Sequence, residues 1–333
     1  MQLKVVGIVV SGKLKYFQQC IDAISKQEVP FEKVVVVPWG NEREKIEDFA
    51  KKQEKIKIQI VPPSEDSTLE GARNNALYSI GSNPPDWVAF IDDDTEIDSK
   101  WLQEMIAAAN ELGNNYTFAS VVTYASKPNI VQGAGHILFE ARPLDCAYNH
   151  PISAICTSDD PLCPCGNCAF VPWKAIEEIS KLDKEIWDPR FRQWQTCFDF
   201  GLKLRLVNFG CRLVRSAFAK HEGACGRKKV YSKDDVINQL RSRILLYDKF
   251  YPEEERKNVM KLLENAVRRW KKNGYPSAPQ CKGNEMEEIF NEALNQEKEL
   301  KRGMSKVWLR RMEELDERYR RSLLFDGSTL PPP

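Results

Sequence analysis

The sequence lacks the features of a membrane-spanning, nucleic-acid-binding or repeat protein. Its 333 residues carry 49 lysines and arginines against 48 aspartates and glutamates, so no net field favours a nucleic acid as partner. No apolar run approaches the roughly 20 residues that cross a bilayer, and no internal repeat is evident. The first residues, MQLKVVGIVVSGKLKYF, lack the cleavage pattern of a signal peptide. We therefore expect a cytoplasmic protein with no nucleic-acid partner.

What the first half of the sequence does contain is a regular alternation of short apolar strands and helices. Strands are predicted at 3–10, 33–38, 55–61, 88–91 and 116–124, and helices at 14–27, 42–53, 70–80 and 99–112, the last capped by Ser99. The strict alternation in KIKIQIV (55–61) is typical of an edge strand with one wet face. This order predicts an α/β fold with a doubly wound, mostly parallel sheet flanked by helices.

The second half is organised differently. From about 125 to 170 the pattern loosens into segments containing glycine, proline and cysteine, which we interpret as connections that carry function. Regular structure returns with WKAIEEISKL (173–182) and FDFGLKLRLVNFG (198–210), and beyond about 230 the pattern is helical and rich in charge. The final GSTLPPP is typical of a disordered tail.

Three adjacent aspartates, Asp92, Asp93 and Asp94, follow the apolar run 88–91. In open α/β sheets the carboxyl ends of the strands line the crevice where ligands bind. Carboxylates this close repel each other, and the repulsion raises their pKa values unless a cation neutralises them. A divalent metal is the natural partner, since hard cations prefer oxygen ligands. The alternative is a solvated turn that caps the helix beginning near Trp101.

Four motifs occur in a characteristic order: GARNNAL (71–77), IDDDTEID (91–98), FDFGLKLRLVNFG (198–210) and KHEG (220–223). In this order the sequence resembles an inverting, metal-dependent glycosyltransferase of family 2, a family with the GT-A fold. The resemblance covers about the first 250 residues. It implies that a sugar is transferred from a nucleotide-diphosphate donor to a hydroxyl of a glycan or glycolipid, with Mn²⁺ or Mg²⁺ stabilising the departing diphosphate.

The resemblance also assigns roles to residues around the metal. Asp94 is implied as the direct metal ligand, and His221 matches the histidine that adds a nitrogen ligand. Asp92 is implied as the contact to the ribose, with Asp93 sharing in nucleotide binding. Arg73 falls where the family places an arginine that holds the nucleotide. Taken alone, His221 reads as an ordinary half-buried histidine and Arg73 as a salt bridge on a helix face.

Two further residues are candidates for donor binding. Family members usually carry an aspartate that recognises the base in the loop VVPWGNE (36–42), and here Trp39 is the side chain able to stack on the base. This departure leaves the base open among UDP-, GDP- and dTDP-linked donors. Arg227, in the stretch GACGRKK, is placed to put positive charge on the diphosphate when that loop closes; a solvated basic turn is the alternative.

The general base implied by the resemblance is Asp199, which would take the proton from the acceptor hydroxyl. It matches the second acid of the family's Glu-Asp pair, while Phe198 and Gly201 replace acids at neighbouring positions. The alternative is an acid stabilised by a helix N-terminus. Gly166, Asn167 and Trp194 are implied to line the acceptor side.

Cysteines cluster in CTSDDPLCPCGNCAF, at Cys156, Cys163, Cys165 and Cys168. Four thiolates at this spacing can hold a structural Zn²⁺, although the C-x-C-x-x-C spacing differs from the paired C-x-x-C pattern of zinc sites. The second interpretation is that these small residues pack behind the acceptor pocket.

These inferences predict a catalytic domain over 1–228, with a nucleotide-binding part at about 1–124 and an acceptor-binding part at about 125–228. A helical region at 229–325 and a disordered tail at 326–333 follow it. The amphipathic stretch 305–325 either packs on the core or a second subunit, or lies on the inner face of a membrane that holds a lipid-linked acceptor. Two rivals remain, a nucleotidyltransferase on a related α/β fold and a non-catalytic binding protein with a cysteine-rich metal module.

Overall fold

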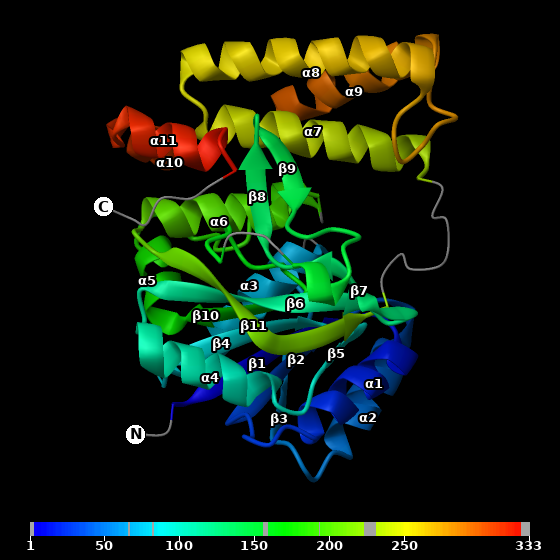
Figure 1. The fold of residues 1–333 in the computed structure, drawn as a ribbon. Helices are drawn as coiled ribbons and strands as arrows, with labels where there is room; N and C mark the ends of the chain where they lie inside the picture. The colour runs from blue at the N-terminus through cyan, green and yellow to red at the C-terminus, as the bar shows by residue number, and fades with distance from the viewer. Residues whose placement is uncertain are drawn as a thin grey trace.

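The computed structural model describes residues 3–65, 67–81, 83–155, 159–192, 194–222 and 231–327. Within these residues, nine strands form one mixed sheet in the order β3-β2-β1-β4-β10-β6-β11-β5, with β7 paired to β6, and β8 and β9 form a separate hairpin. Helices cover the sheet, and a layer of C-terminal helices lies above it in Figure 1. The predicted α/β sheet flanked by helices, with a helical C-terminal extension, is confirmed.

The strands are β1 Val5–Ser11, β2 Lys33–Pro38, β3 Ile58–Ile60, β4 Trp87–Asp92, β5 Thr95–Ile97, β6 Tyr116–Tyr124, β7 Lys127–Gly133, β8 His136–Phe139, β9 Arg142–Asp145, β10 Cys168–Pro172 and β11 Gly210–His221. The α-helices are α1 Leu14–Ser25, α2 Arg43–Lys51, α3 Leu69–Ile80, α4 Trp101–Leu112, α5 Trp173–Ser180, α6 Thr196–Leu206, α7 Lys233–Phe250, α8 Glu253–Asn273, α9 Asn284–Leu300, α10 Val307–Glu314 and α11 Glu317–Leu324. Three short 3₁₀ turns are η1 Gly40–Glu42, η2 Ile152–Ala154 and η3 Pro189–Phe191.

Strand β4 is buried on both faces, as its continuous apolar run predicts. Val88 and Phe90 belong to the core beneath α3 and α6, whereas Ala89 and Ile91 belong to the core beneath α1 and α4. Because β4 pairs in parallel with β1, the carboxyl ends of the two strands meet at one edge of the sheet. Strand β3 lies at the end of the sheet with half-buried residues, in agreement with the predicted edge.

Two local predictions need correction. Helix α4 begins at Trp101 after an N-cap at Lys100 with no side-chain cap, so Ser99 does not cap it; Asp98 Oδ1 accepts the Lys100 N–H instead, at 3.1 Å. The stretch 125–170, predicted to be irregular, contains the strands β7 to β10. Strand β10 pairs with the distant β4, and β8 and β9 pair across a turn with positive φ at Glu140 and Ala141, which a periodicity within one segment does not reveal.

The C-terminal helices bury their apolar faces within the same chain. Trp308 and Met312 of α10 and Tyr319, Leu323 and Leu324 of α11 all belong to the main core, which also contains residues of the sheet. The packing interpretation of 305–325 is therefore confirmed for the part of the chain that the structure describes. Among those same residues, no helix is both long and apolar enough to cross a membrane.

Candidate active site

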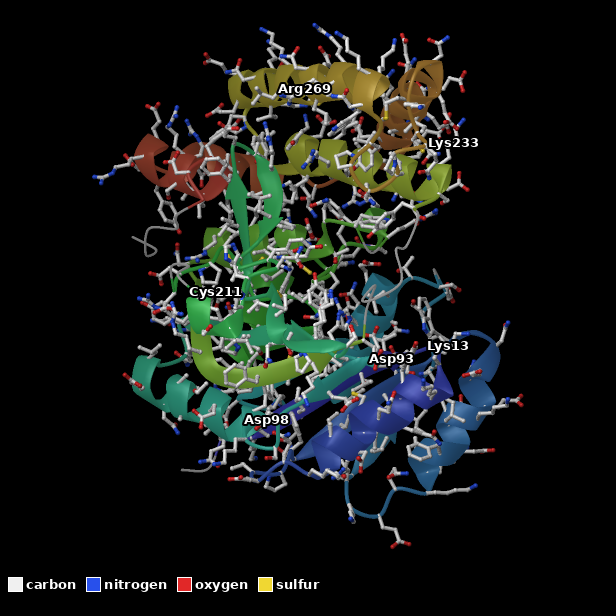
Figure 2. The ribbon with its side chains drawn as sticks, turned by 45° about the vertical axis from the view of Figure 1, so that its right-hand side comes forward. Lys13, Asp93, Asp98, Cys211, Lys233 and Arg269 are labelled. Atoms are coloured by element: carbon white, nitrogen blue, oxygen red, sulfur yellow. The ribbon has the colours of Figure 1, made fainter. Side chains whose placement is uncertain are left out.

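The three aspartates lie where β1 and β4 end side by side. Val10 pairs with Asp92, so the residues after β1 face the residues after β4. The Ser11 hydroxyl donates to Asp93 Oδ2 at 2.7 Å, and the Gly12 N–H donates to the same oxygen at 3.2 Å. Figure 2 shows Asp93 at this edge, next to Lys13 at the start of α1. The sheet thus delivers the carboxylates to the edge that the sequence predicted.

The carboxylates carry an unfavourable charge density when no cation is present. Burial raises the pKa of Asp93 to about 6, because the bond from Ser11 offsets only part of this effect and Asp94 adds to it. Burial likewise raises the pKa of Asp92, against the opposing charge of Arg73. Raised carboxylate pKa values mark a site that gains from a bound cation.

Arg73 is held rigidly beneath Asp92 by helix α3. Its side chain is almost fully buried, and Nη2 donates to Asp92 Oδ1 at 2.7 Å and to the Gly166 carbonyl at 2.9 Å. The guanidinium also lies 4.5 Å from the centre of the Trp187 ring. The ion pair of Arg73 is therefore not the salt bridge on a helix face that was the alternative interpretation, because it is buried and joins α3 to Asp92 of β4.

His221 reaches Asp94 from the end of β11. The antiparallel pairing of His221 with Thr95 of β5 brings the ring next to the aspartates, with Nε2 at 3.0 Å from Asp94 Oδ1. Burial lowers the pKa of His221, but Asp94 outweighs burial and raises it. One ligand atom each from Asp92, Asp94 and His221 all lie within 4.8 Å of one another. Two carboxylate oxygens and one imidazole nitrogen suit Mn²⁺ or Mg²⁺.

Gln132 of β7 orients the histidine, which the sequence analysis did not predict. The His221 Nδ1 lies 2.8 Å from Gln132 Oε1. Because an amide oxygen can only accept, Nδ1 donates in this contact, and the contact fixes the ring so that Nε2 lies against Asp94; Nε2 can offer its lone pair to a metal once its own proton is lost. The two residues are 89 positions apart, so no local motif links them.

Asp199 lies in a different environment from the other predicted site residues. Its side chain is fully buried near the start of α6, with Oδ1 at 2.5 Å from Lys249 Nζ and Oδ2 at 3.1 Å from Lys203 Nζ. Both oxygens therefore face ammonium groups rather than a solvent-accessible pocket. This geometry opposes the abstraction of a proton from an acceptor, so the general-base role of Asp199 remains a prediction that its surroundings do not favour.

Asp199 is part of a buried charge network that joins α6 to α7. Lys249 of α7 also contacts Asp188 at 2.7 Å, and Asp188 accepts two bonds from the Arg190 guanidinium at 2.7 and 2.6 Å. Burial would raise the pKa of Asp188, but Lys249 and Arg190 hold it well below its usual range. Burial would lower the pKa of Lys249, but Asp199 and Asp188 raise it. These shifts show that the charged forms are stabilised by one another.

The remaining predicted donor and acceptor residues are near the site to different degrees. Trp39 packs over Gly12, where an added Cβ would lie 2.5 Å from the indole Nε1, so it sits beside Asp93. The Gly166 carbonyl holds Arg73 and the Asn167 carbonyl accepts the Asp92 N–H at 3.1 Å. Trp194 is half-buried, with its ring centre 5.6 Å from that of Tyr231. Arg227 lies outside the described residues.

In the described residues, no three cysteine sulfurs lie close enough together to hold a metal. Cys163 Sγ contacts the Cys197 carbonyl at 3.1 Å, Cys165 Sγ accepts the Gly135 N–H at 3.3 Å, and Cys168 Sγ lies 3.5 Å from Ser120 Oγ. Among the described residues, only Asp92, Asp94 and His221 bring three possible ligand atoms this close together, and Cys156 lies outside those residues. Burial raises the pKa of Cys168 to about 12, so this thiol stays protonated. The described residues therefore do not support a zinc site. The interpretation that these cysteines pack behind the proposed acceptor pocket, near Gly166, fits their contacts better.

Comparison with known proteins agrees with this geometry. The model of the family described as glycosyl transferase family 2 matches residues 5–178, just over half of the chain. No curated protein matches the chain. The match favours a glycosyltransferase over a nucleotidyltransferase or a non-catalytic binding protein.

Two solved structures show the same fold at low sequence identity. The crystal structure of GalNAc-T7 with UDP, GalNAc and Mn²⁺ is 12% identical, with a TM-score of 0.59 over 94% of this chain and 56% of that one. The crystal structure of S. aureus TarS is 15% identical, with a TM-score of 0.52 over 96% of this chain and 52% of that one. The chain thus spans little more than half the length of these proteins.

Proposed function

The chain belongs to glycosyl transferase family 2, and on this basis we propose that it moves a sugar from a nucleotide-diphosphate donor to a hydroxyl of a glycan or glycolipid acceptor. The observation that carries the proposal is the convergence of Asp92, Asp94 and His221, with one ligand atom each within 4.8 Å, at the carboxyl edge of a GT-A sheet. The similar structure of GalNAc-T7 contains UDP and Mn²⁺, which supports a nucleotide and a divalent metal here as well.

The proposed metal would stabilise the diphosphate as the glycosidic bond breaks. Asp94 and His221 would hold the ion, and Gln132 would keep the His221 Nε2 aimed at it. Asp92, which the sequence placed on the ribose, is near enough to serve as a third ligand. The Arg73 guanidinium fixes that carboxylate in place through the 2.7 Å bond.

Around the metal, the side chains have separate proposed tasks. Trp39 and Asp93 would contact the nucleotide, since both lie against Ser11 and Gly12 at the end of β1. Gly166 and Asn167 supply backbone carbonyls next to Asp92, and Trp194 would face the acceptor. Arg227 is proposed, as the sequence analysis suggested, to place positive charge on the diphosphate; it is not among the described residues.

We propose inversion at the anomeric carbon on the basis of the family resemblance, which also implies Asp199 as the general base. The contacts with Lys203 and Lys249 would have to open before Asp199 could accept a proton. The configuration of the product, read by NMR from the coupling of its anomeric proton, tests inversion independently of any residue. A product that retains the donor's configuration would exclude a single displacement assisted by one base.

The first test is a calorimetric titration of UDP, GDP and dTDP into the full chain, with Mn²⁺ and then with EDTA. We expect one nucleotide to bind in Mn²⁺ and to lose its affinity in EDTA. Asp94→Asn should weaken that binding at least about tenfold because it removes a first ligand. Asp98→Asn, an exposed carboxylate on the same segment, is the matched control. Equal binding with Mn²⁺ and with EDTA would refute the metal site.

A further inference from the structure

A hollow of about 590 Å³ lies in the upper helical layer, between the β8–β9 hairpin and helices α7 and α8. It is lined by Arg142, Arg243, Ala266, Arg269, Trp270, Asn273, Gly274 and Pro276. Three of these eight residues are arginines and none is acidic. Figure 2 shows Arg269 in the helical layer, well away from Asp93 at the sheet edge. This arginine pocket is therefore separate from the proposed metal site.

The positive charge of the arginine pocket is not neutralised by the protein. Within the described residues, no hydrogen bond or ion pair engages the guanidinium of Arg243 or Arg269. Arg142 has one loose contact, 3.5 Å to Glu140, and both side chains are about half exposed, so the contact contributes little. By contrast, Arg73 and Arg190 each contact a carboxylate closely. The chain thus leaves a surplus of cationic charge in this hollow.

Arg243 is the least exposed of the three arginines, since its side chain is only partly accessible to water. Its neighbours include phenols rather than carboxylates: burial raises the pKa of Tyr247 and of Tyr275, and the nearby charge of Arg243 opposes that rise. Withdrawing a guanidinium from water without an anionic partner costs free energy. A bound anion would recover that cost.

The turn that carries Arg142 is strained and firmly fixed. Glu140 and Ala141 form the two-residue hairpin loop with φ of 48° and 59°, a conformation that residues with a side chain adopt at a cost. Three hydrogen bonds hold it: Glu140 and Ala141 donate to the carbonyls of Phe325 and Leu324, and Tyr247 donates to the Ala141 carbonyl. Elements from three parts of the chain thereby set the position of Arg142 at the rim.

We propose that the arginine pocket is a metal-independent binding site for a phosphate-bearing ligand. The three guanidiniums that line the pocket carry more positive charge than the single negative charge of a carboxylate ligand could neutralise. A phosphate group can carry two negative charges, and the planar guanidinium donors fit its oxygens in pairs. Trp270 and Pro276 add apolar wall, and the volume is that of a small-molecule site, so the ligand is larger than a bare phosphate. The phosphate would contact Arg243 and Arg269, with the rest of the molecule against Trp270.

A second hollow in the molecule shows that such a lining is not general. A cavity of about 720 Å³ between α1, β5 and β11 is lined by both signs of charge: Asp22 pairs with Lys26 on α1, and Glu96 lies beside Lys220 on the paired strands β5 and β11. The described lining of the arginine pocket includes no acid, and Glu140 at its rim makes only the 3.5 Å contact with Arg142. This difference between the two linings favours the binding of an anion in the hollow of the helical layer.

The test is a calorimetric titration of inorganic pyrophosphate into the full chain at low ionic strength, with EDTA present to silence the metal site. We expect binding that the double variant Arg243→Gln/Arg269→Gln weakens at least about tenfold. Arg268→Gln, an exposed arginine on the same helix that does not line the pocket, should bind within about twofold of the wild type. Near-ultraviolet circular dichroism of each variant confirms an unchanged fold.

Several results would overturn the proposal. Absence of pyrophosphate binding to the folded wild type would remove the site, and equal affinity in the wild type and the double variant would place the anion elsewhere. Citrate binding more tightly than pyrophosphate would contradict the choice of phosphate over carboxylate. Because EDTA is present throughout, failure here leaves the Mn²⁺-dependent part of the nucleotide titration unaffected. Nucleotide binding that persists in EDTA but is lost in Arg243→Gln/Arg269→Gln belongs to the arginine pocket, so repeating the nucleotide titration with that double variant keeps the two proposals separate.

Discussion

At the scale of single residues, Gln132 makes the most specific prediction about the metal site. Its carbonyl oxygen accepts the proton of His221 Nδ1 and so aims Nε2 at Asp94 and at the proposed metal position. We expect Gln132→Leu to weaken Mn²⁺ affinity by about 10- to 100-fold, the usual effect of losing an outer partner of a ligand histidine. The free Mn²⁺ signal in electron paramagnetic resonance measures this directly.

The conservative control is Gln132→Glu, which also presents an oxygen to Nδ1. It should keep Mn²⁺ affinity at or above the wild-type value, because a carboxylate accepts the same bond more strongly. If Leu and Glu variants lose affinity equally, the contact with Gln132 does not orient the histidine.

Asp199 is the residue at which two roles can be separated by experiment. Its neutralised, buried position predicts that Asp199→Asn costs about 3–5 kcal/mol of unfolding free energy, because Lys203 and Lys249 lose their shared partner. The double variant Asp199→Asn/Lys249→Met should cost less than the sum of the single changes, since one unpaired charge is then removed. Urea unfolding followed by circular dichroism measures both values.

A general base would behave in the opposite way. Asp199→Asn would then leave the unfolding free energy nearly unchanged while transfer activity, compared at equal folded fraction, fell by about two to four orders of magnitude. Only that pattern would support the role implied by the resemblance.

These residues also show how far sequence reasoning reaches into a site. Asp92, Asp94, His221 and Arg73 were predicted because each follows a strand end or lies in a recognisable motif, and the fold brings all four together. Gln132 and Lys249 were missed because their contacts span 89 and 50 or more positions and involve residue types common on any surface. Long-range pairing with no local pattern cannot be read from periodicity.

At the scale of elements, the β8–β9 hairpin offers a test of backbone strain. Its loop needs positive φ at Glu140 and Ala141, which glycine and asparagine tolerate far better. We expect Glu140→Asn/Ala141→Gly to raise the unfolding free energy by about 1 kcal/mol in urea. Glu140→Ala alone keeps the strained position occupied by a residue with a Cβ, and should give no such gain.

The packing of the Ala141 methyl group opposes the gain expected from relieving the strain in that hairpin. It is fully buried, so removing it costs packing free energy that partly offsets the relief of strain. A double variant that is less stable than the wild type would mean that packing by Ala141 outweighs its unfavourable φ.

The same hairpin explains why the fold was predicted unevenly. Strands such as β1, β2 and β4 are buried on both faces, and their continuous apolar runs identify them without knowledge of their partners. Strands β8 and β9 are four residues each, with exposed and half-buried positions, and they depend on contacts with α7 and α11. Short strands whose stability comes from other elements leave little pattern in the sequence.

At the scale of the whole molecule, the predicted boundary near residue 228 lies in a stretch outside the described residues, and it remains a proposal. The packing across it is extensive. One continuous core contains Val6 and Phe90 of the sheet together with Leu240 of α7 and Trp308 of α10. The Asp199 network adds a charged link between α6 and α7. The proposed boundary near residue 228 separates the catalytic region from the helical region, but the packing that stabilises the protein extends across it.

This shared core predicts that the two proposed regions unfold together. In scanning calorimetry the full chain should give a single transition whose calorimetric and van't Hoff enthalpies agree, because the main core is built from residues of both regions. A chain cut after residue 304 should lose most of this stability, since it exposes the surface that Trp308, Met312 and Leu323 cover. Removing only residues 328–333 is the control and should leave the transition within about a degree of its original position. Two separate transitions in the full chain would instead show that the sheet and the helical layer are independent domains, and that the lysine contacts of Asp199 can open without unfolding the catalytic part.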